Sequence, residues 1–288
     1  MTTHPPLQYG ITVVIPALHE ARTIEQTVRC CRACTDIQEI VVIDNGSLDE
    51  TALRAEEAGA TVLSVLPRNR SRARNAGLFR ARYEYTLFLD AGVTFEPAAI
   101  EALLNRFHAT PALVAAQGVL RSAGTKIHPE KEPQGLEEID CFSHLGSRYT
   151  DTKALMVRTR IARDIAGFDE CLKRTEDIDF GWRLTNAGLL FSCEPRALFW
   201  TPGATSLISA CRRGIQTARA LVTLHRKWYC FKPYSMFQVL VLFLFIGRRQ
   251  IHHMQYRPRR ERWCMLLDGI VTFCVYFMVR AWRQISPR

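Results

Sequence analysis

The sequence predicts an α/β fold in which a mostly parallel sheet is flanked by helices and followed by a basic, hydrophobic helical extension. Short β-branched apolar runs, such as Ile11–Ile15 and Ile40–Ile43, alternate with helical patterns, as expected of βαβ units. Charge is also unevenly divided: residues 205–288 hold 15 Lys+Arg and 2 Asp+Glu, whereas residues 1–204 carry a net charge of −3. We therefore expect one α/β domain over residues 1–204 and a helical region over residues 205–288.

The composition is that of a folded protein in a reducing compartment. Of the 288 residues, 48% are hydrophobic and 23% are charged. The ten cysteines are scattered; Cys30, Cys31 and Cys34 share one helical pattern without a second pair or a histidine at zinc spacing. The first residues lack a basic segment followed by an apolar run, so no signal peptide is expected. These features predict a cytoplasmic protein with reduced, buried thiols.

Apolar periodicity predicts the elements of the first domain. The expected strands are Ile11–Ile15, Ile40–Ile43, Thr61–Val65, Tyr85–Leu89, Ala112–Val119, Leu155–Val157, Leu189–Cys193 and Ala197–Trp200. The expected helices are Ala21–Cys34, Leu48 to about Gly59, and Pro97–Phe107. Ser47 and Glu50 have the spacing of a capping box, which predicts that the second helix begins at Leu48, with Gly59 as its C-cap. Residues 121–149 are expected to form a long loop with a short helical piece, over or beside the site.

Two of the expected strands end in an aspartate. Asp90 follows the buried strand Tyr85–Leu89, and Asp44 follows Ile40–Ile43. In open α/β sheets, ligands bind in the crevice outside the carboxyl ends of the strands. Asp90 is therefore a candidate metal or phosphate-side group, although an aspartate at this place can equally cap the turn that leads to the next helix.

Two charged segments are further candidates for the site. Residues 67–77 hold arginines at positions 68, 70, 72 and 74, which indicate either a solvated helix start or a cationic rim facing an anionic ligand. Glu176, Asp177 and Asp179 lie within four residues at the expected start of another helix. Acidic residues are favourable in the first turn of any helix, but one of these three could instead act as a general base.

The extension has the pattern of a membrane-surface region. A basic helix is expected over 211–229, and two apolar runs, 236–246 and 265–279, flank a segment with six arginines. Each run is shorter than the about 20 apolar residues that a spanning helix needs. Hydrophobic helices lying in or dipping into an anionic membrane surface fit this pattern, and a buried helical hairpin or a homo-oligomer contact is the alternative. Nucleic acid is not an expected partner, because the arginines alternate with long apolar runs rather than single stacking aromatics.

Taken in order, these segments resemble the family 2 glycosyltransferases. The matching features are the first strand, the loop at Asp44, the basic segment Arg72–Asn75, Asp90 and the stretch Thr175–Leu184. The resemblance covers about residues 10–204 and implies the GT-A fold, a single α/β domain that binds a nucleotide-sugar. It implies that the nucleotide is contacted by Pro16, Ala17, Glu20, Asp44, Arg74 and Asn75. A carboxylate at Asp44 can accept a hydrogen bond from the ring N–H of uracil or thymine, and a UDP-sugar is the expected donor.

The resemblance also implies a divalent cation on the diphosphate of the donor. The family's DxD carboxylates bind Mg²⁺ or Mn²⁺, but this chain reads Asp90-Ala91-Gly92, and residues 198–202 lack the histidine that often completes the site. Asp90 is thus expected to hold the metal weakly, with waters and phosphates as the other ligands. Alternatively, the arginines at 68–74 stabilise the leaving diphosphate in place of the metal.

The family's ED pair matches Glu176 and Asp177. It implies a single displacement with inversion at the anomeric carbon, in which a carboxylate takes the proton of the acceptor hydroxyl. Asp177 is the expected base and Glu176 the second candidate, whereas Asp179 and Arg183 are expected to be structural.

The leading hypothesis is an inverting glycosyltransferase, peripheral on the cytoplasmic face of the membrane, that transfers a sugar to a hydroxyl of a lipid-linked or amphipathic acceptor. The departures at Gly92 and Trp200 motivate a second hypothesis, a nucleotide-sugar-binding scaffold with impaired turnover. A sugar-phosphate nucleotidyltransferase is disfavoured because residues 10–20 contain no Gly-rich phosphate loop.

Overall fold

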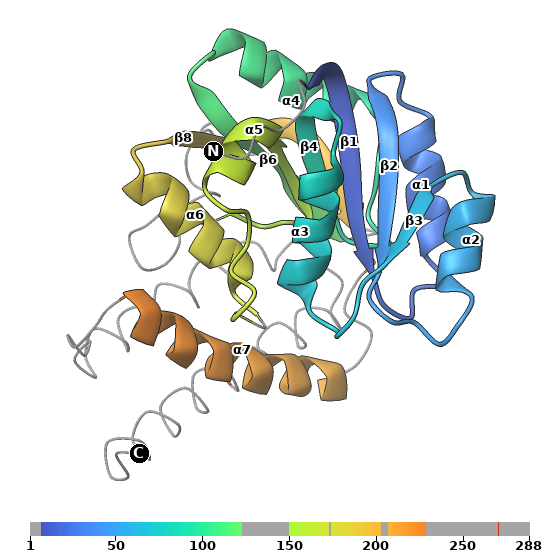
Figure 1. The fold of residues 1–288 in the computed structure, drawn as a ribbon, viewed down its shortest axis with the longest axis vertical. Coiled ribbons are helices and arrows are strands. Elements are labelled where there is room, and N and C mark those ends of the chain that lie inside the picture. The colour runs from blue at the N-terminus through green and yellow to red at the C-terminus, as the bar shows by residue number, and fades with distance from the viewer. Residues whose placement is uncertain (1–6, 123–149, 173, 203–206, 229–269, 271–288) are drawn as a thin grey trace, which may run out of the picture.

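An eight-stranded sheet with helices on both faces forms the body of the protein (Figure 1). The computed structural model describes residues 7–122, 150–172, 174–202, 207–228 and 270. The strands are β1 Gln8–Ala17, β2 Ile37–Asp44, β3 Thr61–Ser64, β4 Tyr83–Leu89, β5 Thr94–Phe95, β6 Leu113–Ser122, β7 Ala154–Arg158 and β8 Leu190–Thr201. The helices are α1 Ile24–Arg32, α2 Thr51–Glu57, α3 Arg70–Arg80, α4 Pro97–Ala109, α5 Thr159–Asp164, α6 Glu176–Asn186 and α7 Leu207–Trp228. The expected α/β fold is therefore confirmed.

The sheet is mixed, with parallel pairing concentrated in its amino-terminal half. Its strand order is β3-β2-β1-β4-β7-β6-β8-β5. The pairs β2/β3, β1/β2, β1/β4 and β6/β8 are parallel, whereas β4/β7, β6/β7 and β5/β8 are antiparallel. Because β7 runs against β4, with Leu89 opposite Ala154, the start of β7 lies beside the carboxyl end of β4. The carboxyl ends of β1, β2 and β4 and the beginning of β7 therefore lie side by side along one end of the sheet.

Two hydrophobic layers hold the helices against the sheet. Val13 and Ile15 of β1 are fully buried on the face covered by α1 and α4, and Val14 is buried on the face covered by α3, α5 and α6. Successive strand residues point to opposite faces, so an unbroken apolar run is what a strand covered on both sides requires. This explains why β1, β2 and β4 could be predicted from their composition.

Several predicted boundaries were wrong. The first helix, expected over Ala21–Cys34, spans Ile24–Arg32. The helix expected to begin at Leu48 begins at Thr51, because Ser47 Oγ accepts a hydrogen bond from the backbone N–H of His19 and the Leu48 N–H donates to His19 Nδ1. The Ser47 hydroxyl, which was expected to cap the helix, instead bonds the loop after β2 to the loop after β1. The strands expected at 189–193 and 197–200 form the single strand β8, whose pairing with β6 shifts register at Gly118. The short elements β5 and α5 were not predicted.

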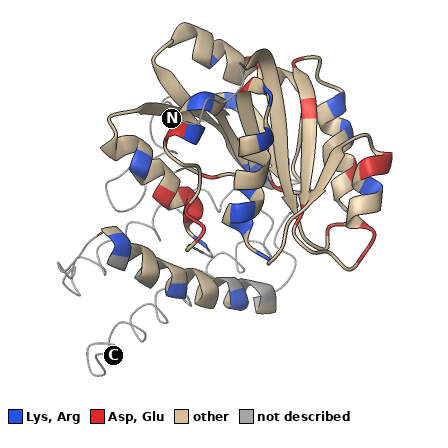
Figure 2. Ribbon diagram, viewed as in Figure 1, with Lys and Arg blue, Asp and Glu red and all other residues tan. Residues whose placement is uncertain are grey.

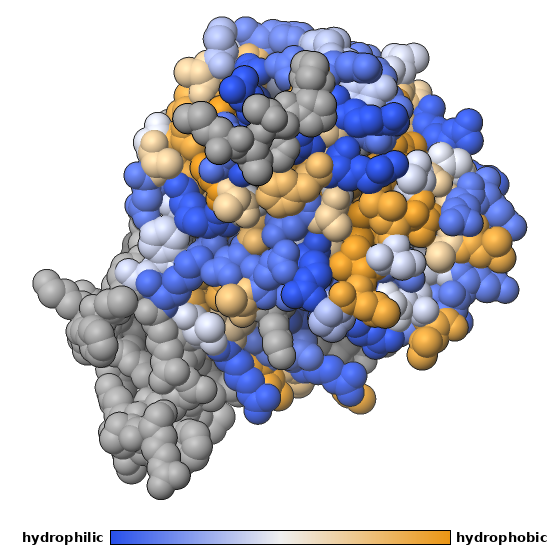
Figure 3. All heavy atoms as spheres, viewed as in Figure 1, coloured by the Kyte–Doolittle hydropathy of each residue, from blue (hydrophilic) through white to orange (hydrophobic). Residues whose placement is uncertain are grey.

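Surface and thiol features complete the description. The cysteines at positions 30, 31, 34, 171, 193 and 211 are free thiols. The coloured part of the face in Figure 3 is largely hydrophilic, with some apolar side chains. Among the described residues, the large hydrophobic side chains that are more than half exposed are Tyr9, Leu48, Leu53, Leu66, Ile208 and Ile270. Within the described residues, no helix combines the length and apolar character needed to cross a bilayer. The loop predicted at 121–149 begins later than expected, because Arg121 and Ser122 belong to β6. Residues 123–149 and the apolar runs 236–246 and 265–279 lie outside the described residues, apart from Ile270.

Candidate active site

A buried arginine joins the three elements that carry the predicted site. Arg74, on α3, is 1% exposed. Its Nη1 lies 2.5 Å from Glu176 Oε1 at the start of α6, and its Nη2 lies 3.1 Å from Asp90 Oδ1 just after β4. Helix α3 is fixed at its own start by Asn69, whose Oδ1 accepts from the Arg72 N–H. Figure 2 shows the basic positions along α3 and the acidic positions at the start of α6 that this pairing brings together.

The pairing sets the charge of Asp90. Burial by itself would raise the pKa of this carboxyl, but the nearby cations Arg74, Arg70 and Lys153 outweigh it and lower the pKa. A carboxylate beside fixed cations stays ionised because the charged form is the one they stabilise. Asp90 therefore presents a permanent negative charge at the carboxyl end of β4, with one of its oxygens already bonded to Arg74.

Asp177 differs from Glu176, its neighbour in the first turn of α6. Burial, together with the negative charges of Glu176 and Asp151, raises the pKa of Asp177 to about 7, and Arg74 only partly opposes this. The Glu176 side chain is 3% exposed and forms a short ion pair with Arg74, whereas Asp177 is half-buried. Asp177 Oδ1 accepts from the Ile178 N–H at 2.9 Å, and the Asp177 carbonyl accepts from the Thr150 hydroxyl at 2.7 Å. Of the two carboxylates, Asp177 has the protonation behaviour of a base that works near neutral pH.

The residues expected to hold the nucleoside gather at the ends of β1 and β2. Ala17 is opposite Asp44 in the parallel register, and the Asn45 N–H donates to the Ala17 carbonyl. Asp44 is 7% exposed, and its Oδ1 accepts from the Ser47 N–H at 3.1 Å. The loop therefore orients this carboxylate beside the end of β1, where Pro16 and Ala17 are the last two strand residues.

Glu20 and Asn75, two other expected nucleotide contacts, already have protein partners. The Glu20 N–H donates to Thr51 Oγ1 at 2.8 Å, and its carboxylate accepts from Thr23 Oγ1 at 2.6 Å. The Asn75 amide donates to the Phe168 carbonyl at 2.9 Å, while its Oδ1 accepts from the Phe168 N–H at 2.8 Å. Both side chains hold loops that border the site.

Gly92 leaves no room for the second carboxylate of a DxD pattern. Its φ is +86°, a conformation that residues with a side chain rarely adopt. A Cβ at this position would lie 2.9 Å from Pro202 Cγ, and the Gly92 N–H donates to Thr27 Oγ1 at 2.9 Å. Across the described residues, no cluster of three or more histidine, cysteine or acidic side chains could enclose a metal ion. Asp90 thus offers a single carboxylate to any cation bound here.

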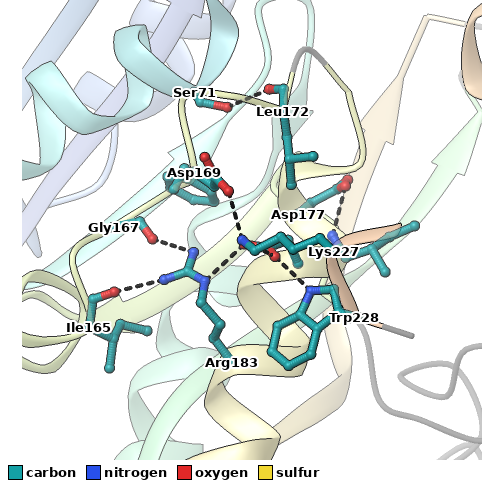
Figure 4. A network of polar contacts seen from close by, with 12 residues as sticks. Ser71, Ile165, Gly167, Asp169, Leu172, Asp177, Arg183, Lys227 and Trp228 are labelled. Atoms are coloured by element: carbon teal, nitrogen blue, oxygen red, sulfur yellow. Dashed lines mark hydrogen bonds and ion pairs between the residues drawn. The ribbon is translucent and has the colours of Figure 1, made fainter. Parts of the chain in front are cut away.

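Helix α7 contacts α6 through a network of ion pairs and hydrogen bonds around Asp179 (Figure 4). Asp179 is fully buried and accepts from Lys227 Nζ at 2.6 Å, Trp228 Nε1 at 2.8 Å and Arg183 Nε at 2.8 Å. Lys227 also pairs with Asp169 at 2.7 Å. These contacts agree with the structural roles expected of Asp179 and Arg183. They link the first helix of the extension to the helix that carries Asp177.

Sequence reasoning missed three polar residues beside the site. Thr150 bonds to the backbone of Asp177, and Asp151 and Lys153 form an ion pair immediately before β7. A charged pair before a strand is common in turns, so the sequence held no signal that would single them out. Their place beside Asp90 follows from the antiparallel pairing of β7 with β4.

Sequence comparison gives a matching family and relatives. The profile of Glycosyl transferase family 2 matches residues 12–162. A pre-mycofactocin glycosyltransferase of Mycobacterium tuberculosis is 30% identical over 205 residues, 67% of this chain and 43% of the relative. A poly-beta-1,6-N-acetyl-D-glucosamine synthase of Staphylococcus aureus is 27% identical over 203 residues, 66% of this chain and 49% of the relative. The chain thus spans about half the length of the curated relatives it matches.

Solved structures share the fold. Glucosyl-3-phosphoglycerate synthase of Mycobacterium tuberculosis, solved with Mg²⁺ and uridine diphosphate, aligns with a TM-score of 0.58 at 19% identity, covering 79% of this chain and 81% of that one. A mannosyltransferase of Pyrobaculum calidifontis, solved with GDP-Man and Mn²⁺, aligns with a TM-score of 0.60 at 14% identity, covering 97% and 82%. At these identities the likeness concerns the fold, which is the GT-A fold expected from the sequence.

Proposed function

The chain belongs to glycosyl transferase family 2, and we propose that it is an inverting glycosyltransferase that moves a sugar from a nucleoside-diphosphate sugar to an acceptor hydroxyl. The observation that carries this proposal is the pair of unlike carboxylates around Arg74. Asp90 has a lowered pKa and remains ionised, whereas the pKa of Asp177 is raised to about 7. Carboxylates whose environments separate their pKa values are suited to different chemical roles in one site.

A UDP-sugar is the proposed donor. Asp44 supports this choice, since its carboxylate at the end of β2 can accept the ring N–H of uracil. Guanine also carries a ring N–H, and the two solved proteins named above were crystallised with uridine and guanosine nucleotides respectively. The residues proposed to border the nucleotide are Pro16, Ala17, Glu20, Asp44, Arg74 and Asn75. Among these, Arg74, Asn75 and Glu20 are proposed to act by holding the surrounding loops.

Asp90 is the proposed protein ligand for a divalent cation. Its free carboxylate oxygen fits one coordination position of Mg²⁺ or Mn²⁺, and such ions commonly take one or two carboxylates with phosphate and water as the other ligands. Gly92 cannot add a second carboxylate. When bound, the cation would neutralise charge on the diphosphate. We therefore propose that the metal supplies only part of the charge stabilisation of the diphosphate, so that activity depends on it only partly.

Asp177 is the proposed general base. As the acceptor oxygen bonds to the anomeric carbon, its proton passes to an Asp177 carboxylate oxygen. The bond between the anomeric carbon and the diphosphate oxygen breaks on the opposite face, so the configuration inverts and the nucleoside diphosphate leaves. Glu176 is proposed to act through Arg74, because the buried ion pair fixes its position.

The acceptor is proposed to be a hydroxyl of a lipid-linked or amphipathic molecule, met at the cytoplasmic face of a membrane. The support is the charge of residues 205–288, a net +13 interleaved with apolar runs. The alternative proposal is that residues 205–288 form a contact between copies of this chain.

A thermal-shift screen tests the proposed function. The full-length protein is heated with UDP-glucose, UDP-N-acetylglucosamine, UDP-galactose and GDP-mannose, each with and without Mn²⁺. A ligand that binds only the folded state raises the melting temperature by mass action, about 2.7 kcal/mol of stabilisation at 100 times its Kd. Stabilisation by one donor, followed by its slow hydrolysis, is expected. Binding without hydrolysis or transfer would favour the scaffold hypothesis instead.

A further inference from the structure

A lysine stands beside the proposed donor site without a role in the reaction described above. Lys153 immediately precedes β7, whose first residue, Ala154, pairs with Leu89 at the end of β4. Because the two strands are antiparallel, Lys153 flanks Asp90 at the edge where β4 ends. In agreement with this register, the positive charge of Lys153 is one of those that lower the pKa of Asp90.

Lys153 is held in place and only partly covered. Its Nζ lies 3.1 Å from Asp151 Oδ2 and 3.4 Å from Oδ1, and its backbone N–H donates to the same carboxylate. Asp151 is itself fixed through its N–H, which donates to Gln117 Oε1 at 2.7 Å. The Lys153 side chain nevertheless remains 44% exposed. An ammonium group has three donors, so the ion pair with Asp151 leaves donors for a ligand.

Not every cation at this edge is available to an additional anion. Arg74 is committed to Asp90 and Glu176, and its own side chain is buried. The position that would carry a second acidic group is closed, since Gly92 has a φ of +86° and a Cβ there would meet Pro202. The site therefore presents one ionised carboxylate, Asp90, beside two cations with partly or fully exposed side chains, Lys153 and Arg70.

We propose that Lys153 binds the diphosphate of the donor and carries part of the charge stabilisation that a fuller metal site would supply. This inference rests on the proposed function, because the diphosphate is that of the nucleotide-sugar. In this arrangement the Lys153 ammonium donates to a phosphate oxygen while Asp151 keeps its ion pair with the same ammonium. A charge-assisted hydrogen bond of this kind gains strength as negative charge builds up on the departing diphosphate.

A purely structural role predicts a different outcome. The Asp151–Lys153 pair is partly exposed, and ion pairs of this kind contribute little to folding. Lys153→Met should therefore fold normally. If the pair served only to order the start of β7, the same variant would bind nucleotides as the parent protein does.

The experiment is titration calorimetry of the full chain with UDP, UMP and uridine, or with the guanosine series if GDP is the nucleotide that binds. Each titration is run with Mn²⁺ and with EDTA. Lys153→Met should weaken UDP about 10- to 100-fold, the range expected for a lost hydrogen bond to a charged group. Uridine affinity should change less than about twofold, and Lys153→Arg should restore most of the UDP affinity because it keeps the positive charge.

Arg82→Met is the matched control. Arg82 lies just before β4, at the opposite end of that strand from Asp90, and pairs with Glu39. The Arg82→Met variant loses one positive charge, as Lys153→Met does, but the change lies away from the site. Its affinity for UDP should therefore equal that of the parent protein. Unchanged UDP affinity in Lys153→Met, or an equal loss for UDP and uridine, would overturn the proposal. A parent protein that binds neither UDP nor GDP would instead overturn the proposed function, and this inference with it.

Discussion

Arg74 and Glu176, 102 residues apart in the chain, form a buried ion pair with 2.5 Å between Nη1 and Oε1. The same guanidinium reaches Asp90, so one side chain ties α3 and α6 to the end of β4. A buried charge is tolerable only when it is paired, which makes the three groups interdependent. The geometry of the proposed base, the residue after Glu176, depends on this tie.

Removing Arg74 should destabilise the fold severely. Arg74→Met removes the ion pairs to Glu176 and Asp90, and breaking a buried pair in this way costs about 3–5 kcal/mol. Urea unfolding followed by circular dichroism measures the change. Arg72→Met is the control, since Arg72 pairs with Glu170 near the surface and should lose only about 0–1 kcal/mol. Equal losses in the two variants would contradict the central place given to Arg74.

Restoring the second carboxylate should fail. Gly92→Asp places a side chain at a φ of +86° and against Pro202. The conformational cost is about 1–3 kcal/mol, and the steric contact adds to it. Gly188→Asp is the control because Gly188 has a φ of +68° with open space around its Cβ, so its loss should be smaller. Thermal unfolding measures both variants. A stable Gly92→Asp protein with strictly Mn²⁺-dependent activity would contradict this account.

Detaching α7 should impair turnover more than donor binding. Lys227→Met removes the ion pairs to Asp169 and Asp179, the second of which lies in the helix that carries Asp177. Because small displacements of a reacting group lower rates strongly, kcat should fall by up to about 10²-fold while the donor KM changes little. Steady-state kinetics separates the two effects. Arg219→Met, an exposed change on the same helix, should keep the parent kcat; a matching loss there would show that α7 acts in some other way.

Loss of the carboxylate at the end of β2 should weaken nucleotide binding. Asp44→Ala removes the proposed acceptor for the base, and a hydrogen bond to a charged group contributes about 1.5–3 kcal/mol, or roughly 10- to 150-fold in Kd. Calorimetry with uridine and UDP should show the same loss for both. Asp36→Ala, just before β2 and so at its other end, is the control. Unchanged affinity in Asp44→Ala would remove Asp44 from the site.

The sequence was informative where local pattern determines structure. Unbroken apolar runs predicted β1, β2 and β4, and the ends of β2 and β4 therefore located Asp44 and Asp90. The acidic first turn of α6 likewise located Glu176 and Asp177. These positions depend on neighbours a few residues away, which a sequence displays directly.

The contacts between residues far apart in the chain could not be predicted from the sequence. The family resemblance singled out Arg74 as a nucleotide contact, but nothing in the sequence indicates that Arg74 is buried between two carboxylates while Arg72 lies near the surface. The role of Lys153 beside Asp90 requires the antiparallel register of β7, and the tie from Lys227 to Asp179 requires the docking of α7. Each depends on contacts between residues far apart in the chain.

The pH dependence of Asp177 and its amide variant is the most direct test of the proposed mechanism. Burial and the charges of Glu176 and Asp151 raise the pKa of Asp177 to about 7. A base must be ionised to take a proton, so kcat should rise about tenfold per pH unit below pH 7 and level off above it. Asp177→Asn should lower the plateau by roughly 10²- to 10⁴-fold and abolish that slope, with donor affinity by calorimetry unchanged. An Asp177→Asn enzyme that retains both the parent kcat and its rise through pH 7 would contradict the assignment of Asp177 as the base.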